Sequence, residues 1–190
     1  MTLHRLTMPQ LERLFRTELK ITFPPAELRP LSAMKKMTAR GVYHPYAWEE
    51  GGDLLGYAFL WNWEEKGYLL LDYLGVPAAR RGQGLGEQLL AGLRETFSAW
   101  KGVFGEVEAP DGGEDDGLRL RRLAFYRRCG FTRLPYDCVL FGVHYQTLLM
   151  GGDPEREGAG VMDTHRKLYQ SAMPGFLYRR MIQIPLETEQ

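Results

Sequence analysis

Six residues between positions 81 and 86 have the composition of a binding site for an anionic group. They read Arg81-Gly82-Gln83-Gly84-Leu85-Gly86. An apolar strand pattern over Leu69–Val76 precedes them, and leucines at helical spacing follow them. The first N–H groups of a helix have no acceptor inside the helix, and they lie at the positive end of its dipole. Because glycines let a ligand approach the backbone closely, this loop predicts a phosphate cradle.

The glycine spacing excludes the two common nucleotide-binding loops. No G-x-x-x-x-G-K-[ST] motif is present, so a Walker-type loop is excluded. Gly82, Gly84 and Gly86 form G-x-G-x-G rather than G-x-G-x-x-G, so a dinucleotide fingerprint fits poorly. A glycine-rich turn without a ligand is the alternative that the loop alone leaves open.

Two motifs together resemble those of the GCN5-related N-acetyltransferase (GNAT) superfamily. Arg81, Gly84 and Gly86 form R-x-x-G-x-G, which resembles the acetyl-CoA signature of that superfamily. The run from Phe125 through Tyr126 to Gly130-Phe131 resembles a second segment of the same superfamily, a helix that ends in F-Y-x-x-x-G-F. They occur in the family's order, with a strand pattern between them.

The resemblance implies a mixed α/β fold of the α+β class. Its central mixed β-sheet would be splayed and flanked by helices on both faces. Acetyl-CoA or another acyl-CoA would bind with its pyrophosphate on the amides of Arg81, Gly82, Gln83, Gly84, Leu85 and Gly86. Its pantetheine would pair with Leu74, Gly75 and Val76. Tyr126 corresponds to the tyrosine that acts as a general acid toward the departing thiolate. Arg119 stands where many members carry an asparagine, seven residues before the tyrosine, so that contact to CoA is not carried over.

Acyl transfer to an amine also requires a group that removes a proton. A primary amine has a pKa near ~10, so it is mostly protonated at neutral pH and cannot attack a thioester. Glu106 is the first candidate for the base, because its strand pattern follows the predicted cradle helix and its context resembles the position that some members of the superfamily use. Glu108 lies two residues further and on the same strand face, and Asp72 is a third candidate. Pairing of these carboxylates with the arginines of residues 119–128, or proton removal by water alone, are the alternatives.

The composition narrows the class of protein. The chain has 190 residues, 44% of them hydrophobic and 25% charged, with a formal net charge of zero. A nucleic-acid-binding protein would usually be basic, and no apolar run reaches the length of a membrane span. No signal peptide is evident at the start, and Cys129 and Cys138 form no C-x-x-C pair. We therefore expect a cytoplasmic protein with reduced thiols, no metal, no nucleic-acid partner and no membrane attachment.

The remaining pattern predicts the elements around these residues. Strand patterns cover residues 3–6, 41–48, 54–63, 68–76, 103–109, 138–141 and 144–150, and helical patterns cover residues 8–19, 26–38, 85–97 and 118–129. Thr7 and Gln10 form a predicted capping box. Residues 151–160 read as a linker, followed by a helical pattern to Ile184 that Pro174-Gly175 interrupts.

We therefore predict a catalytic domain over residues 1–150 and a linker with a helical extension over residues 151–190, packed on that domain. The extension could cover a sheet face, close the acceptor site or mediate homodimerisation. The predicted activity is N-acetylation of a primary amine on a small molecule or peptide, by direct attack in a ternary complex. A CoA-binding sensor without turnover is the alternative.

Overall fold

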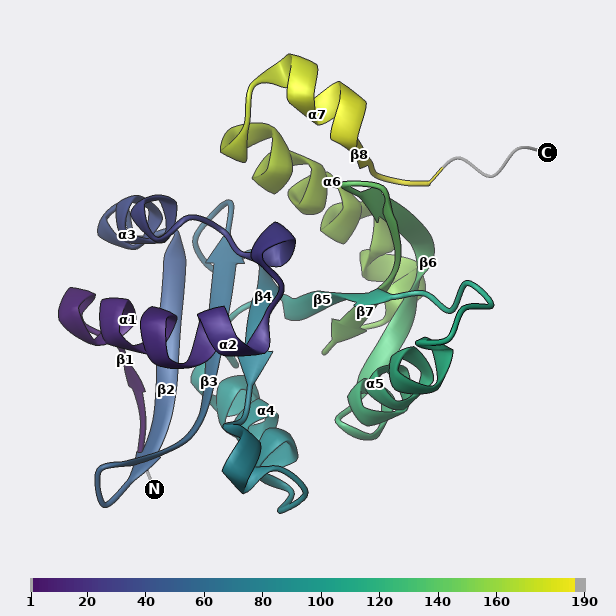
Figure 1. Cartoon of the computed structure of the whole chain (residues 1–190). Helices are drawn as coiled ribbons and strands as arrows, with labels where there is room; N and C mark the ends of the chain where they lie inside the picture. The colour runs from purple at the N-terminus through teal and green to yellow at the C-terminus, as the bar shows by residue number, and fades with distance from the viewer. Residues whose placement is uncertain (1, 187–190) are drawn as a thin grey trace. The chain divides into compact units, whose positions relative to one another are not determined.

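A mixed sheet of eight strands, flanked by helices, is the framework of the protein (Figure 1). The computed structural model describes residues 2–186. The strand order is β1-β2-β3-β4-β5-β7-β6-β8. The chain divides into two units, which are described separately: Met1–Trp61 with Leu71–Thr96, and Asn62–Leu70 with Phe97–Gln190.

The first unit contains the first four strands, of which β3 and β4 continue into the second unit. The strands are β1 (Thr2–Arg5), β2 (Tyr43–Glu50), β3 (Asp53–Asn62) and β4 (Tyr68–Gly75). The helices are α1 (Met8–Leu14), the π-helix η1 (Phe15–Leu19), α2 (Lys20–Thr22), the 3-10 helices η2 (Pro25–Glu27) and η3 (Ala78–Arg80), α3 (Leu31–Ala39) and α4 (Leu85–Thr96).

Aromatic residues fill one face of the sheet in this unit. Tyr57 and Phe59 alternate along β3 and point to the same face. The ring of Phe59 lies 5.9 Å from Tyr43 and 6.0 Å from Tyr73, in edge-to-face geometry. Gly56 points to the opposite face, where a Cβ atom would lie 3.1 Å from Leu89 of α4. The apolar stripe of α4, predicted from its spacing, is thus buried on that second face.

Local sequence signals set the ends of the first helices. The Thr7 N–H donates to Gln10 Oε1 at 2.9 Å, which confirms the predicted capping box. The prediction of a helix over residues 26–38 was wrong in its first part. Pro30 precedes α3, which begins at Leu31, because proline clashes with the preceding turn inside a helix.

The second unit carries the other four strands and three helices. They are β5 (Gly102–Glu108), α5 (Asp116–Arg128), β6 (Phe131–Leu140), β7 (Val143–Met150), α6 (Pro154–Ala172), α7 (Gly175–Met181) and β8 (Ile182–Gln183). Strand β5 runs parallel to β4 and antiparallel to β7. Helix α5 packs against β5 and β6, and α6 packs against β6.

The prediction of a linker over residues 151–160 was wrong, because α6 already begins at Pro154. Asp153 is the N-cap and its side chain accepts a hydrogen bond from the Glu155 N–H at 3.1 Å. Asp followed by Pro at the first helical position is a strong helix start, and it outweighs the polar composition of the next residues.

Within residues 2–186 no helix is long and apolar enough to cross a membrane. The same residues contain no group of three or more His, Cys, Asp or Glu side chains placed to hold a metal ion.

Candidate active site

The loop between β4 and α4 has the open backbone that a phosphate cradle needs. Gly82 and Gly84 have φ values of 78° and 73°, in the left-handed region that favours glycine. A Cβ atom at Gly82 would meet no heavy atom within 4 Å, and one at Gly84 would meet only Gln88 Nε2 at 4.0 Å. The Gln88 N–H donates to the Gly84 carbonyl at 3.2 Å. The N–H groups of the intervening first turn therefore have no acceptor within the helix.

Arg81 fixes this loop to the end of the preceding strand. Its Nε donates to the Val76 carbonyl at 3.2 Å, while the residue is exposed. This bond holds a guanidinium group beside the start of α4. Gln83 and the other loop residues up to Gly84 are exposed as well, whereas Leu85 is buried and anchors the helix.

Tyr57 places a buried hydroxyl group against the end of β4. A Cβ atom on Gly75 would collide with the Tyr57 ring and hydroxyl, so glycine alone fits this position. Among the described residues, the Tyr57 Oη has no hydrogen-bond partner. Burial raises the pKa of Tyr57, so this hydroxyl keeps its proton at neutral pH. The neutral hydroxyl is thus an available donor beside Leu74–Val76.

In the second unit, Glu106 on β5 lies in a network of hydrogen bonds with α6. His165 Nε2 lies 2.6 Å from Glu106 Oε1, and the Tyr169 hydroxyl donates to both carboxylate oxygens at 2.9 Å and 3.0 Å. The His165 side chain is fully buried, whereas 14% of the Glu106 side chain is exposed. On its other side, His165 Nδ1 lies 3.2 Å from the Tyr136 hydroxyl on β6.

The carboxylate and the imidazole have different roles in this network. An ionised carboxylate only accepts hydrogen bonds, so it takes the bond at Oε1 from an N–H at His165 Nε2. The role of His165 Nδ1 toward the Tyr136 hydroxyl depends on the tautomer of the ring. Burial raises the pKa of Tyr136 well above its usual value, so this hydroxyl keeps its proton at neutral pH.

The other two candidate bases are held by arginines. Glu108 Oε2 lies 3.3 Å from Arg122 Nη1 and 3.5 Å from Arg119 Nε, on α5. In the first unit, Asp72 accepts from Arg29 Nε at 3.2 Å and from Arg29 Nη2 at 3.3 Å, and it also accepts from the Tyr43 hydroxyl. The alternative of carboxylate–arginine pairing thus applies to Glu108 and, with a different arginine, to Asp72. Glu106 has a histidine and a tyrosine instead.

Tyr126 lies on α5, half-buried between two aromatic rings. Its ring centroid is 5.2 Å from both Phe125 and Phe131. Burial raises the pKa of Tyr126 to about 12, with Arg122 opposing the shift and Cys129 adding to it. The phenol is therefore protonated at neutral pH and can act as a proton donor.

Arg119 on α5 is paired with three carboxylates. It is paired with Asp111 and Asp116 as well as with Glu108. These contacts hold the acidic loop before α5 onto the end of β5.

Sequence reasoning missed His165 and Tyr169. They belong to a stripe of α6 whose members are buried at helical spacing: Val161, Thr164, His165, Leu168 and Tyr169. A histidine and a tyrosine within an apolar stripe signal polar groups that face the sheet. The sequence does not reveal which strand residue they meet.

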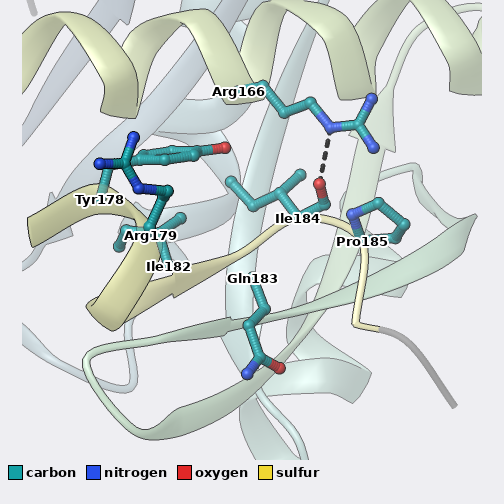
Figure 2. A pocket seen from close by; sticks show the side chains of 7 residues that line it. All are labelled: Arg166, Tyr178, Arg179, Ile182, Gln183, Ile184 and Pro185. Carbon is teal, nitrogen blue, oxygen red and sulfur yellow. Dashed lines mark hydrogen bonds between the residues drawn. The ribbon is translucent and has the colours of Figure 1, made fainter. Parts of the chain in front are cut away.

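The last segments of the chain enclose a pocket on the side of α6 that carries Arg166 (Figure 2). Its volume is about 490 Å³, and Tyr178, Arg179 and residues 182–185 complete its lining. Arg166 Nε donates to the Ile184 carbonyl at 2.6 Å, the bond drawn in Figure 2. This contact ties the segment after α7 to α6.

Several solved structures share the fold of the protein. A GNAT-family protein from Bacteroides thetaiotaomicron matches with a TM-score of 0.71 and 23% identity, over 85% of this chain and 93% of that one. A GNAT-family protein from Desulfovibrio desulfuricans gives a TM-score of 0.61 and 23% identity, over 79% and 98%. An aminoglycoside 6'-N-acetyltransferase complexed with coenzyme A matches with a TM-score of 0.57 and 14% identity, over 78% of this chain and 96% of that one. These likenesses establish an acyltransferase fold.

The family model of the acetyltransferase (GNAT) family matches residues 8–131, more than half of the chain. The protein therefore belongs to the GNAT acetyltransferase family and is an acetyltransferase enzyme. No match was found among curated proteins. The matched range includes Arg81–Gly86, Glu106 and Tyr126, and it ends before α6.

Proposed function

We propose that the protein transfers an acetyl group from acetyl-CoA to a primary amine by direct attack within a ternary complex. The observation that carries this proposal is the open glycine loop at the start of α4. Gly82 and Gly84 leave space at their Cα atoms, and the first turn of a twelve-residue helix offers N–H groups with no acceptor inside the helix. Such a turn is suited to a pyrophosphate.

The end of β4 also fits the pantetheine of CoA. The pantetheine arm carries amide carbonyl groups, and the Tyr57 hydroxyl is a donor without an acceptor. A carbonyl group beside Gly75 would satisfy it, since a buried unpaired hydroxyl is costly. We therefore assign Leu74, Gly75 and Val76 to the pantetheine and Arg81, Gly82, Gln83, Gly84, Leu85 and Gly86 to the pyrophosphate.

When bound, acetyl-CoA supplies a thioester, and the remaining work is done by residues of the chain. The amine nitrogen forms a bond to the acetyl carbon while the carbon–sulfur bond breaks. Glu106 receives the proton of the amine, directly or through a water molecule. Tyr126, which is protonated at neutral pH, donates a proton to the leaving sulfur. The products are an N-acetylated amine and free CoA.

The state of Cys138 supports direct transfer over an acyl-enzyme. Burial raises the pKa of this thiol well above its usual value, and the residue is fully buried. The nucleophilic form of a cysteine is the thiolate, so this thiol is a poor acceptor of the acetyl group. Both cysteines are free thiols, which agrees with our proposal of a cytoplasmic location.

For the acceptor we propose a small-molecule amine or a peptide amine. One structural neighbour is named as an aminoglycoside acetyltransferase, which gives one amine class to include in an assay. We further propose that residues 1–150 form the catalytic domain, with residues 151–190 packed on it. Whether the protein forms a homodimer is tested by measuring its molecular mass in solution by sedimentation.

The proposal is tested by replacing Gly84 with valine. The valine side chain would occupy the space needed by the pyrophosphate, so the affinity for acetyl-CoA measured by calorimetry should fall about 10- to 100-fold. Gly41→Val is the matched control, because Gly41 also has a positive φ of 75° and no heavy atom near its Cβ position. Both variants carry the same backbone strain. Equal acetyl-CoA affinity in the two variants would contradict the assignment.

A panel of amines then identifies the acceptor. Polyamines, amino acids, aminoglycosides and peptides are incubated with acetyl-CoA, and CoA release and the mass of the acetylated product are measured. Acetyl-CoA binding without acetylation of any amine would favour the alternative of a sensor that lacks turnover with these acceptors.

A further inference from the structure

The environment of Glu106 differs from that of the other strand carboxylates. Glu108 and Asp72 are paired with arginines. Glu106 accepts its hydrogen bonds from His165 and Tyr169. An arginine is a permanent positive charge that lowers the proton affinity of a carboxylate. Uncharged donors also orient a carboxylate, but they lower its proton affinity less than an arginine does.

The hydrogen bonds occupy the two oxygens of Glu106 unequally. Oε1 accepts from His165 at 2.6 Å, and it shares the Tyr169 hydroxyl proton with Oε2. Each carboxylate oxygen has two lone pairs. Oε2 is therefore the oxygen with more capacity to receive a proton, and the network fixes its direction.

Only Glu106 of this network can reach a substrate. Its side chain is 14% exposed, whereas His165 is fully buried and Tyr136 and Tyr169 are also buried. His165 lies in a cage of aromatic rings, with Phe104 at 5.2 Å and Tyr169 at 5.5 Å. A buried histidine with both nitrogens hydrogen-bonded is held in one orientation.

Several other titratable groups face Glu106 within this unit. From β6 these are Tyr136 and Cys138, and burial raises the pKa of both far above neutrality. From α6 they are His165 and Tyr169, and from β7 the register partner is Thr147, which does not titrate in this range. Arg166 of α6 acts on Tyr136, where it opposes the larger effect of burial on the pKa.

Close packing holds α6 at the distance that these bonds require. A Cβ atom on Gly158 would lie 3.0 Å from the ring of Pro135 on β6, and one on Gly160 would lie 3.2 Å from the ring of Tyr68 on β4. The Tyr68 hydroxyl also donates to Glu157 of α6. The two glycines thus let the helix approach the strands closely enough for His165 and Tyr169 to reach β5.

We propose that α6 completes the catalytic apparatus: His165 and Tyr169 are positioning residues that orient the Glu106 carboxylate and leave its Oε2 to receive the proton of the amine. This inference rests on the proposed function. It adds two residues that lie beyond the range matched by the family model.

Tyr169→Phe and His165→Phe test the inference, because each removes a donor that stabilises the ionised carboxylate. The pH dependence of kcat/KM is measured with an amine that the wild-type protein acetylates. The acidic limb should move to higher pH by about 1–2 units in each variant, the size expected for loss of a hydrogen bond to a charged group. Affinity for acetyl-CoA should stay at the wild-type value.

Tyr68→Phe is the matched control. It also removes a tyrosine hydroxyl that donates to a carboxylate of α6, but that carboxylate is Glu157. It should lower stability without moving the acidic limb. The inference would be overturned if the acidic limb of the pH profile of Tyr169→Phe coincided with that of the wild type. It would also be overturned if Tyr68→Phe moved the limb by the same amount. If His165→Phe does not fold, Tyr169→Phe still decides, since it removes a single oxygen atom.

A second measurement separates this inference from the proposed function. The carboxyl bands of wild type and Tyr169→Phe are titrated by infrared difference spectroscopy, with Glu106→Gln assigning the band of Glu106. A band that titrates at higher pH in Tyr169→Phe supports the network even if no amine is acetylated. An unchanged band refutes the network even if acetylation is observed.

Discussion

Burial determines the chemistry that Tyr126 can perform. An exposed phenol has a pKa of about 10, and burial raises that of Tyr126 to about 12. The higher value keeps the proton on the oxygen throughout the neutral range. It also means that the phenol is a weak acid, which must be placed close to a strongly basic group to donate a proton. A leaving thiolate is a weaker base than this phenolate, since a thiol has a pKa of about 8.5, so the Tyr126 hydroxyl acts on the leaving sulfur mainly through the hydrogen bond that it donates.

We therefore expect Tyr126→Phe to lower kcat by about 10- to 1,000-fold, around the usual size of a general-acid contribution. The KM for acetyl-CoA should change little, because the lost interaction is made in the transition state. Steady-state kinetics with calorimetric affinities checks both expectations. Phe125→Leu is a suitable control, since it changes the ring contact at 5.2 Å but leaves the hydroxyl in place. A wild-type kcat in Tyr126→Phe would reduce Tyr126 to a packing residue.

At the scale of elements, α6 can pack closely on β6 because the residue at the contact is a glycine. Gly158 is buried, and a Cβ atom there would lie 3.0 Å from both Cγ and Cδ of Pro135. The pyrrolidine ring is closed onto the backbone of β6 and cannot rotate away. The strand or the helix would have to move instead.

Gly158→Ala should therefore lower the free energy of unfolding by about 1–3 kcal/mol, the usual range for overpacking. Helix propensity alone would give the opposite sign, since alanine stabilises a helix interior by about 1 kcal/mol relative to glycine. Gly117→Ala on α5 is the matched control, because no heavy atom lies within 4 Å of its Cβ position. Chemical denaturation should show Gly117→Ala unchanged or more stable. A stabilised Gly158→Ala would show that the interface adapts without cost.

The sequence predicted the elements whose signals are local. Leu85, Leu89, Leu90 and Leu93 recur at helical spacing, and all are buried in α4. The glycine loop before them was predicted from residue types alone. Each signal is complete within a few residues, so no knowledge of the remaining chain is needed.

The contacts of Glu106 depend on positions far apart in the chain. His165 lies 59 residues beyond Glu106, and Tyr169 lies 63 residues beyond it. The strand pattern correctly gave β5, and the helical pattern after residue 160 gave most of α6, but neither pattern showed that this helix contacts Glu106. The polar start of α6 obscured where the helix begins, because residues 155–160 lack apolar periodicity. Cap chemistry at Asp153 and Pro154 was the signal that could have located it.

At the scale of the whole molecule, tyrosines with raised pKa values recur in both units. Burial is the main cause that raises the pKa of each of six of them: Tyr43, Tyr57, Tyr68, Tyr73, Tyr126 and Tyr136. Each folded-state pKa lies above the unfolded value of about 10. The folded protein therefore binds these protons more tightly than the unfolded chain does, and the sign of the effect on stability follows by linkage.

Below about pH 10 both states keep the tyrosine protons, and the contribution of burial to stability is fully present. Above about pH 10 the unfolded chain loses these protons while the folded protein retains them, so stability falls as the pH rises toward the folded values, about 12 for Tyr126. We expect melting temperatures from circular dichroism to decrease steeply above about pH 10, with phenolate absorbance rising together with unfolding.

Free tyrosine amide measured in parallel shows the intrinsic titration. Phenolate absorbance that rises fully near pH 10 while the circular dichroism stays native would show that these hydroxyl groups are accessible to solvent, and it would remove the physical basis for a protonated Tyr126 held by burial.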